Sequence, residues 1–146
     1  AYYLNNIVGN LDALRDLPNL YFDLAMVNHW EVMEYAFGML DPRRVLYGSD
    51  VPLALAPGKT VEINSQYTYV TPKPWALSIS DDHGKLVFTS FLYEELRAVR
   101  KAVERLRLGS DFVEGLFHAN GMELLRKVLE DMSSASTGAV VERRSA

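Results

Sequence analysis

The chain of 146 residues contains no cysteine, and this absence excludes disulfide bonds and thiolate metal sites. A metal bound by this chain would have to accept carboxylate and imidazole ligands instead. A chain without disulfides also suits the reducing cytoplasm, which is the predicted location. No apolar run approaches the roughly 18 residues that a membrane-spanning helix needs, and no signal-peptide pattern opens the chain. We therefore expect no membrane association.

An excess of positive charge is lacking as well. The chain has 15 Lys and Arg residues against 19 Asp and Glu residues, a formal net charge of -4, and no basic block. Such a chain is not expected to bind nucleic acid. The phosphate-binding glycine loop, the Gly-x-Ser-x-Gly turn and the His-Glu-x-x-His helix are absent too. Ser49 has no identifiable base nearby in the sequence, so a serine nucleophile is not indicated.

Helices and strands alternate in the pattern up to Asp50. Apolar residues at helical spacing predict helices over 5–17 and 30–40. Short apolar runs bounded by turn residues predict buried strands at 20–24 and 45–48. This alternation is typical of a parallel α/β unit, in which the two strands lie side by side and the helix covers one face.

The segment 51–88 breaks this alternation: it contains four of the chain's six prolines and shows no helical period. Short strands are predicted at 61–63 and 66–70, and a hairpin is predicted from 77–79 and 86–88 around an Asp-Asp-His-Gly turn. Connections of this length are typically lids or binding loops. The alternative is a surface excursion that packs on itself.

The remainder of the chain has the pattern of helices. Residues 89–108 form the clearest amphipathic helix, capped by Thr89 or Ser90 and ended by Gly109. Shorter helical patterns begin at Ser110 and at Asn120, where Asn120 is the predicted N-cap.

Asp50 is the leading candidate for chemistry because it directly follows the predicted strand 45–48. In parallel α/β proteins, functional side chains lie at the carboxyl ends of the strands. On the pattern alone, capping of the turn before Pro52 is the commoner role of such an aspartate.

The stretch Arg-Val-Leu-Tyr-Gly-Ser-Asp-Val-Pro around Asp50 resembles the last-strand motif of the amidohydrolase-related family. These proteins are metal-dependent hydrolases and decarboxylases built on a (β/α)8 barrel. Val51 departs from the pattern, because an aromatic residue is frequent there. The resemblance covers most of residues 5 to 132, and further stretches agree in order at 19–24, 91–94 and 117–125.

The resemblance implies an α/β fold, namely the C-terminal segment of a (β/α)8 TIM-type barrel with parallel strands and flanking helices. Residues 1–132 would form the partial barrel domain with 51–88 as an insertion, and 133–146, rich in Ser and charged residues, would be a disordered tail. A complete barrel needs roughly 250 residues. The missing strands would therefore come from other polypeptide, and a start at Ala1 rather than methionine suits a fragment or a processed chain.

The resemblance also implies a function for Asp50. This carboxylate would bind a divalent metal, with zinc the expected ion, and would take the proton of the attacking water. The substrate would be a small molecule that is hydrolysed, or alternatively decarboxylated, in a pocket walled by His29, Tyr67, Tyr69 and Trp75. The other metal ligands in the family are histidines on earlier strands, so this segment alone is expected to be inactive.

Other residues have ordinary structural interpretations. His83 suits a solvated turn and His118 a structural position, while Tyr93 and Glu94 begin a helix whose dipole favours an acid. Asp23 is either a strand-edge acid or a buried group facing the barrel. A different class of function also remains open, a non-catalytic α/β module that binds a partner or forms a homo-oligomer, because an open strand edge demands a neighbour.

Overall fold

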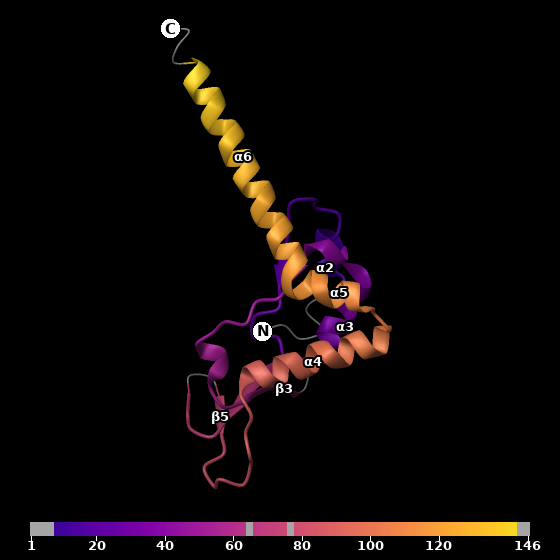
Figure 1. The fold of residues 1–146 in the computed structure, drawn as a ribbon. Coiled ribbons are helices and arrows are strands. Elements are labelled where there is room, and N and C mark those ends of the chain that lie inside the picture. Colours follow the sequence, from indigo (N-terminus) through magenta and orange to yellow (C-terminus); the bar gives the residue numbers. More distant parts are fainter. Residues whose placement is uncertain (1–7, 64–65, 76–77, 143–146) are drawn as a thin grey trace.

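The computed structural model describes residues 8–63, 66–75 and 78–142, which form a mixed α/β structure with two small sheets (Figure 1). The first sheet contains β1 (Phe22–Asp23) and β2 (Val45–Leu46). The second contains β3 (Lys59–Ile63), β4 (Gln66–Thr71) and β5 (Ser78–Ser80). The helices are α2 (Asn10–Leu14), α3 (Trp30–Met39), α4 (Phe91–Leu106), α5 (Ser110–Glu114) and α6 (Asn120–Glu142).

The parallel unit predicted from the first part of the sequence is confirmed. Strands β1 and β2 pair in parallel, with Phe22 opposite Val45 and Asp23 opposite Leu46, and α3 lies between them in the chain. The predicted helix over 5–17 is found as the shorter α2, and its first residues lie outside the described range. Within the described residues this sheet has only two strands, so the structure establishes a mixed α/β class and not a barrel.

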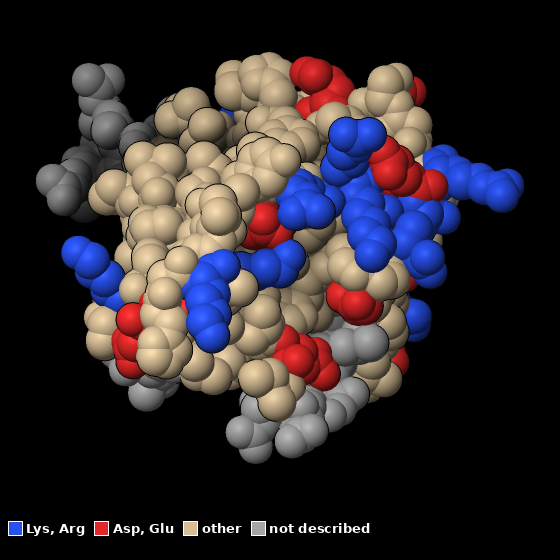
Figure 2. All heavy atoms as spheres, turned by 90° about the horizontal axis from the view of Figure 1, so that it is seen from below, with Lys and Arg blue, Asp and Glu red and all other residues tan. Residues whose placement is uncertain are grey.

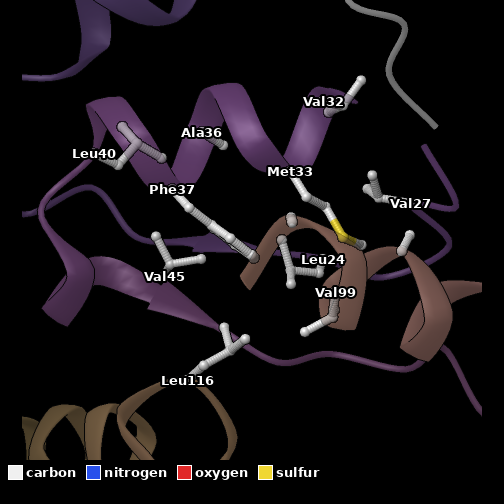
Figure 3. Packing of buried hydrophobic residues seen from close by; sticks show 12 residues of the cluster. Leu24, Val27, Val32, Met33, Ala36, Phe37, Leu40, Val45, Val99 and Leu116 are labelled. Carbon is white, nitrogen blue, oxygen red and sulfur yellow. The ribbon is translucent and has the colours of Figure 1, made fainter. Parts of the chain in front are cut away.

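The main core forms where α3 and α4 pack against the β1–β2 sheet (Figure 3). Met33 and Phe37 from α3, Val45 from β2 and Val99 from α4 are all buried. Burial of each such side chain stabilises the fold by about 1.5–3 kcal/mol. This packing fixes the position of α4 relative to the carboxyl ends of both strands.

The insertion agrees with the sequence in one half only. Strands β3 and β4 pair antiparallel, as the predicted strands there require. The predicted hairpin of 77–79 with 86–88 is wrong: Ser78 and Ile79 belong to β5, which pairs in parallel with β4, and no strand forms at 86–88. The reason is side-chain hydrogen bonding. The Thr71 hydroxyl on β4 donates to the Ser78 hydroxyl at 2.8 Å, and the Asp81 carboxylate accepts the Leu86 N–H at 2.7 Å. Residue 77 lies outside the described range.

Helix α4 begins as predicted, since the Ser90 hydroxyl accepts the Tyr93 N–H at 3.2 Å. Its end differs from the prediction. Arg107 (φ 55°), and not Gly109, takes the left-handed conformation, and Gly109 instead precedes α5. A left-handed residue at this position lets the last carbonyls of a helix be satisfied.

Helix α5 continues through a π-helical turn, Gly115–Ala119, directly into α6. Asn120 is therefore not an N-cap, because its backbone is helical. Its side-chain amide instead donates to the carbonyl oxygens of Pro42 (2.7 Å) and Val45 (2.8 Å). These two hydrogen bonds connect the start of α6 to the residues at the beginning of β2.

Helix α6 extends to Glu142 and leaves the body of the molecule (Figure 1). The disordered tail predicted for 133–146 is thus helix up to Glu142, and the last four residues lie outside the described range. Two serine side chains hydrogen-bond to the backbone of α6 itself: the Ser133 hydroxyl donates to the Leu129 carbonyl and the Ser134 hydroxyl to the Glu130 carbonyl. No helix in the described part of the chain is both long and apolar enough to cross a membrane.

Candidate functional site

Asp50 lies just beyond the carboxyl end of β2, as the sequence predicted, and its side chain is exposed. Its backbone has a φ of 54°, an uncommon conformation for a residue other than glycine that aspartate tolerates better than most. The Asp50 carbonyl accepts the Ala54 N–H at 3.0 Å, so the backbone holds the following turn. Among the described residues, no hydrogen bond or ion pair occupies the Asp50 carboxylate.

Asp23 ends β1 and lies beside the segment that leads to Asp50. A Cβ at Gly48 would lie 3.2 Å from the Asp23 Cβ, so glycine allows this close approach of the two strand ends. One Asp23 oxygen accepts the Ala25 N–H at 3.0 Å, and the residue is exposed. Both parallel strands therefore present a carboxylate at the same edge of the sheet.

A third carboxylate, Glu95 on α4, completes this group and was not identified from the sequence. The residue is 0% exposed. Its Oε2 accepts the Met26 N–H at 3.3 Å, while its Oε1 has no hydrogen-bond partner among the described residues. Burial raises the pKa of Glu95 to about 7, with a smaller contribution from the charges of Asp23 and Asp50. The Met26 N–H and the Tyr47 hydroxyl oppose this rise.

Tyr47 directly follows β2, and its hydroxyl group interacts electrostatically with the Glu95 carboxylate. Burial, together with the Glu95 charge, raises the pKa of Tyr47 to about 12, so the phenol stays protonated at neutral pH. The two side chains interact, but neither the Tyr47 hydroxyl nor Glu95 Oε1 makes a hydrogen bond of good geometry to any described residue. Buried polar atoms without partners are uncommon in native proteins.

The sequence pattern of α4 did not single out Glu95. Among the apolar residues at helical spacing on this helix, Val99 is buried, Leu92 is partly buried and Leu96 is exposed. A second buried stripe runs through positions i, i+4, i+7 and i+11, namely Phe91, Glu95, Ala98 and Ala102. Two of its four residues are alanine and one is the acid itself, so this stripe has little hydrophobic signal in the sequence.

The three aromatic residues proposed as pocket walls come together on one side of the β3–β4–β5 sheet. Ring centroids lie 5.7 Å apart for Tyr67 and Tyr69, and 5.2 Å apart for Tyr69 and Trp75. Tyr69 also packs edge-on against Phe91 of α4 at 5.6 Å. Burial raises the pKa of Tyr69, and Tyr67 and Asp50 add to the rise. The Asp50 charge therefore reaches this aromatic group.

His29 precedes α3 and is placed differently from the other predicted wall residues. Its Nδ1 lies 3.9 Å from Glu62, which is opposite Tyr67 in the β3–β4 pair, and its Nε2 is buried without a partner among the described residues. Burial lowers the pKa of His29, against the opposing charges of Glu62 and Glu31. His29 thus joins the aromatic side through Glu62, and no described hydrogen bond or ion pair links it to Asp50.

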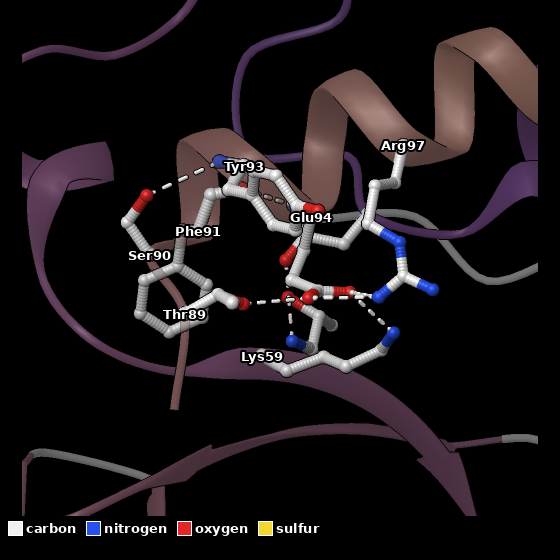
Figure 4. Close-up of polar contacts among 9 residues, drawn as sticks. Lys59, Thr89, Ser90, Phe91, Tyr93, Glu94 and Arg97 are labelled. Atoms are coloured by element: carbon white, nitrogen blue, oxygen red, sulfur yellow. Dashed lines mark hydrogen bonds and ion pairs between the residues drawn. The ribbon is translucent and has the colours of Figure 1, made fainter. Parts of the chain in front are cut away.

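Glu94, next to Glu95, belongs to a satisfied polar network (Figure 4). Its carboxylate accepts Lys59 Nζ at 2.6 Å, the Thr89 hydroxyl at 2.6 Å and Arg97 at 3.3 Å. Burial alone would raise the pKa of Glu94, but the bonds from Lys59 and Thr89 outweigh it, and the pKa lies below its usual value. This network joins β3 to the start of α4, so Glu94 has a structural role.

The carboxylates of Asp23, Asp50 and Glu95 supply hard oxygen donors, the type that divalent cations accept. Within the described ranges, however, no three His, Asp or Glu residues are arranged to hold a metal ion. The donor chemistry fits part of a coordination sphere, and further ligands would have to come from outside these residues.

Other surface features have structural explanations. Figure 2 shows Lys and Arg side chains grouped on one face among acidic side chains. On α4, the three arginines are paired with acids: Arg97 with Glu94, Arg100 with Glu104 and Arg105 with Glu34. The Lys101 ammonium lies 3.9 Å from the centroid of the Trp30 ring. His83 and His118 are both exposed.

A mainly apolar hollow of about 520 Å³ lies beside β1. Its lining comes from α2, β1 with the segments before and after it, α3 and β2, and includes Leu11, Leu20, Phe22, Asp23, Met33 and Val45. The hollow therefore borders the edge of β1 that has no partner strand in the described structure.

Asp50, Asp23, Glu95, Tyr47 and the aromatic group thus form one site at the carboxyl end of the parallel strands. No protein-family model, no curated protein and no solved structure matches the chain.

Proposed function

We propose that this chain is the C-terminal part of an amidohydrolase-like hydrolase that acts on a small-molecule substrate. The observation that carries the proposal is the position of the Asp50 carboxylate. It emerges, unpaired within the described residues, at the carboxyl end of a parallel β–α–β unit, beside Asp23 and Glu95. Parallel α/β folds place their chemistry at this edge. Decarboxylation instead of hydrolysis is the alternative outcome of the same site.

In this proposal Asp50 is a metal ligand and proton acceptor, and the missing ligands are supplied by the rest of the barrel. A bound divalent ion, with zinc the expected one, would supply activated water. The exposed Asp50 carboxylate is positioned at the carboxyl end of β2 to take the proton of the attacking water. Glu95, with its raised pKa, can hold a proton at neutral pH and return it. Tyr67, Tyr69 and Trp75 exclude water from one side, with His29 behind Glu62.

Two features support completion by further polypeptide. The outer edge of β1 has no partner in the described structure, and the apolar hollow lies directly beside it. Such an edge is normally covered by another strand. The cytoplasmic location expected from the cysteine-free sequence is part of the same proposal.

The test uses the complete natural protein that contains this chain. Bound metal is measured, and hydrolysis is assayed with a panel of esters, lactones and carboxylates. Asp50→Asn is expected to lower metal content and to reduce kcat/KM by roughly a hundredfold or more. The exposed Asp16→Asn serves as the matched control and should change neither. Unchanged metal content and hydrolysis in Asp50→Asn would exclude the proposed role.

A non-catalytic module that acts by association is the second candidate, and the surface of α6 favours it. Met122, Leu125, Leu129 and Met132 are exposed and recur at spacings of three and four, the pattern of a helix-pairing face. If association is the function, light scattering should show an oligomer that Leu125→Glu with Leu129→Glu dissociates. Asp50→Asn should then leave every measured property unchanged.

A further inference from the structure

The strand that leads to Asp50 is held by the π-helical turn that joins α5 to α6. This turn spans Gly115–Ala119, and the Asn120 N–H donates to the Gly115 carbonyl across it. The Leu116 side chain of the turn is buried in the main core (Figure 3), so the turn is packed onto the sheet. Turns of this kind are rare and occur frequently at functional sites.

Three hydrogen bonds connect the turn to β2 and its flanking residues. The Asn120 side-chain amide has two N–H donors, and its two bonds go to the carbonyls of Pro42 at 2.7 Å and Val45 at 2.8 Å. The Leu116 carbonyl accepts the Tyr47 N–H at 2.9 Å. The same short segment therefore fixes the strand both where it begins and where it ends.

Contacts beyond Tyr47 carry this restraint toward Asp50. The Tyr47 ring packs against Phe117 of the turn, with 4.4 Å between the ring centroids. The next residue, Gly48, lies against Asp23, since an added Cβ would be 3.2 Å from the Asp23 Cβ. Asp50 follows two residues later. A shift of the end of β2 would therefore move Asp50 relative to Asp23.

The aromatic side of the site has a different support. Tyr67 and Tyr69 lie on β4, and Tyr69 packs against Phe91 of α4 at 5.6 Å. The two side-chain bonds of Asn120 go to the β2 region instead. Loss of the Asn120 bonds should thus disturb the carboxylate and spare the aromatic residues.

We propose that Asn120 is a positioning residue, which sets the place of the Asp50 carboxylate by holding β2. A reacting group displaced by about 1 Å can lower a rate on the order of a hundredfold, so a residue outside the reacting centre can control kcat. The catalytic consequence rests on the proposed function of Asp50, whereas the restraint on β2 does not.

The experiment measures hydrolysis by the complete natural protein, at a temperature at which every variant is fully folded. Asn120→Leu keeps the size of the side chain and removes both N–H donors. We expect kcat to fall roughly tenfold or more and KM to change less than about twofold, because the aromatic residues stay in place. Asn120→Gln keeps the amide on a longer side chain and should recover part of the loss. Thr89→Val, which loses a hydrogen bond elsewhere, is the matched control and should retain kcat.

Hydrogen exchange followed by mass spectrometry gives a readout that does not depend on activity. The Ala54 N–H bonds to the Asp50 carbonyl at 3.0 Å and reports on the turn that carries the carboxylate. In Asn120→Leu, peptides containing Tyr47 and Ala54 should exchange on the order of tenfold faster, while peptides from β3 and β4 keep their protection. Equally faster exchange throughout the protein would overturn the proposal, because Asn120 would then only stabilise the fold.

Phe117→Leu keeps the test decisive if Asn120→Leu does not fold. It removes the ring beside Tyr47, leaves the amide bonds intact and should lower kcat by a few fold. Unchanged kcat in the Asn120 and Phe117 variants, or an equal loss in Thr89→Val, would overturn the proposal. If Asp50→Asn leaves hydrolysis unchanged, the proposed function fails, and the exchange measurement still decides whether β2 is held in this way.

Discussion

Two neighbouring glutamates on α4 occupy opposite electrostatic environments. Glu94 is 6% exposed and Glu95 is 0% exposed, so both are withdrawn from water. Glu94 accepts bonds from Lys59, Thr89 and Arg97, while Glu95 accepts one backbone N–H and keeps a free oxygen among the described residues. The pKa of Glu94 lies below its usual value and that of Glu95 rises to about 7.

The comparison separates a buried acid whose charge is stabilised by the fold, Glu94, from one whose charge is not, Glu95. The Glu94 network joins β3 to α4 and compensates the cost of burying a charge. No described cation pairs with Glu95, so the cost of burying its charge is not compensated. This residue lies near the carboxyl ends of the strands, where α/β folds bind their ligands. Perturbed acids in such positions are typical of functional sites.

The largest expected effect comes from removing the uncompensated charge. The raised folded pKa of Glu95 means that its stabilising contribution is complete below the usual value of 4.5 and is lost as pH rises through about 7. Glu95→Gln removes this loss. We expect the variant to exceed the wild type by on the order of 3 kcal/mol in unfolding free energy above neutral pH. The two proteins should be nearly equal at about pH 4.

Urea unfolding at a series of pH values measures this profile. The groups that act on Glu95 are the Met26 N–H, the Tyr47 hydroxyl and the charges of Asp23 and Asp50. A difference between the two proteins that does not depend on pH would contradict the account.

Removing the partner of the compensated charge should act in the opposite direction. Lys59→Met takes away one of the two 2.6 Å bonds to Glu94 and should cost about 1–3 kcal/mol near neutral pH. The lowered pKa of Glu94 means that its contribution is present above the usual value and is lost as pH falls through the folded pKa. The cost should therefore shrink in acid. A cost that stays equally large once the pH lies below the folded pKa of Glu94 would show that lost packing, not charge, is responsible.

The smallest expected effects on stability come from removing the hydroxyl groups of Thr89, near Glu94, and Tyr47, near Glu95. Thr89→Val removes a hydroxyl that donates to Glu94 and should cost roughly 1 kcal/mol. Tyr47→Phe removes a hydroxyl without a partner of good geometry and should change stability by less than about 0.5 kcal/mol. Thermal unfolding of both variants checks the order. The reverse order would mean that Tyr47 makes a real bond to Glu95.

Regular periodicity made the parallel unit predictable. The apolar spacing from Trp30 to Leu40 and the short runs around Phe22 and Val45 have few alternative structures, so β1, α3 and β2 follow from the sequence. Asp50 was found for the same reason, because it follows a recognisable strand. Tyr67 and Tyr69 were found because alternation along β4 places them on one face.

The rest depends on contacts between distant parts of the chain. The Ser78 hydroxyl bond to Thr71 and the Asp81 bond to Leu86 replace the predicted hairpin. The Asn120 amide reaches the carbonyls of Pro42 and Val45 instead of capping a helix. Burial of Glu95 arises from the packing of α4 on residues near Met26, which no local pattern reports.

The most direct test is the titration of the two carboxyl groups by NMR in the folded protein. The account predicts that Glu95 titrates at about pH 7 and that Glu94 titrates below 4.5, with Glu95→Gln and Glu94→Gln used to assign the signals. A Glu95 carboxyl that titrates at its ordinary value would contradict the central claim that this buried charge is left uncompensated.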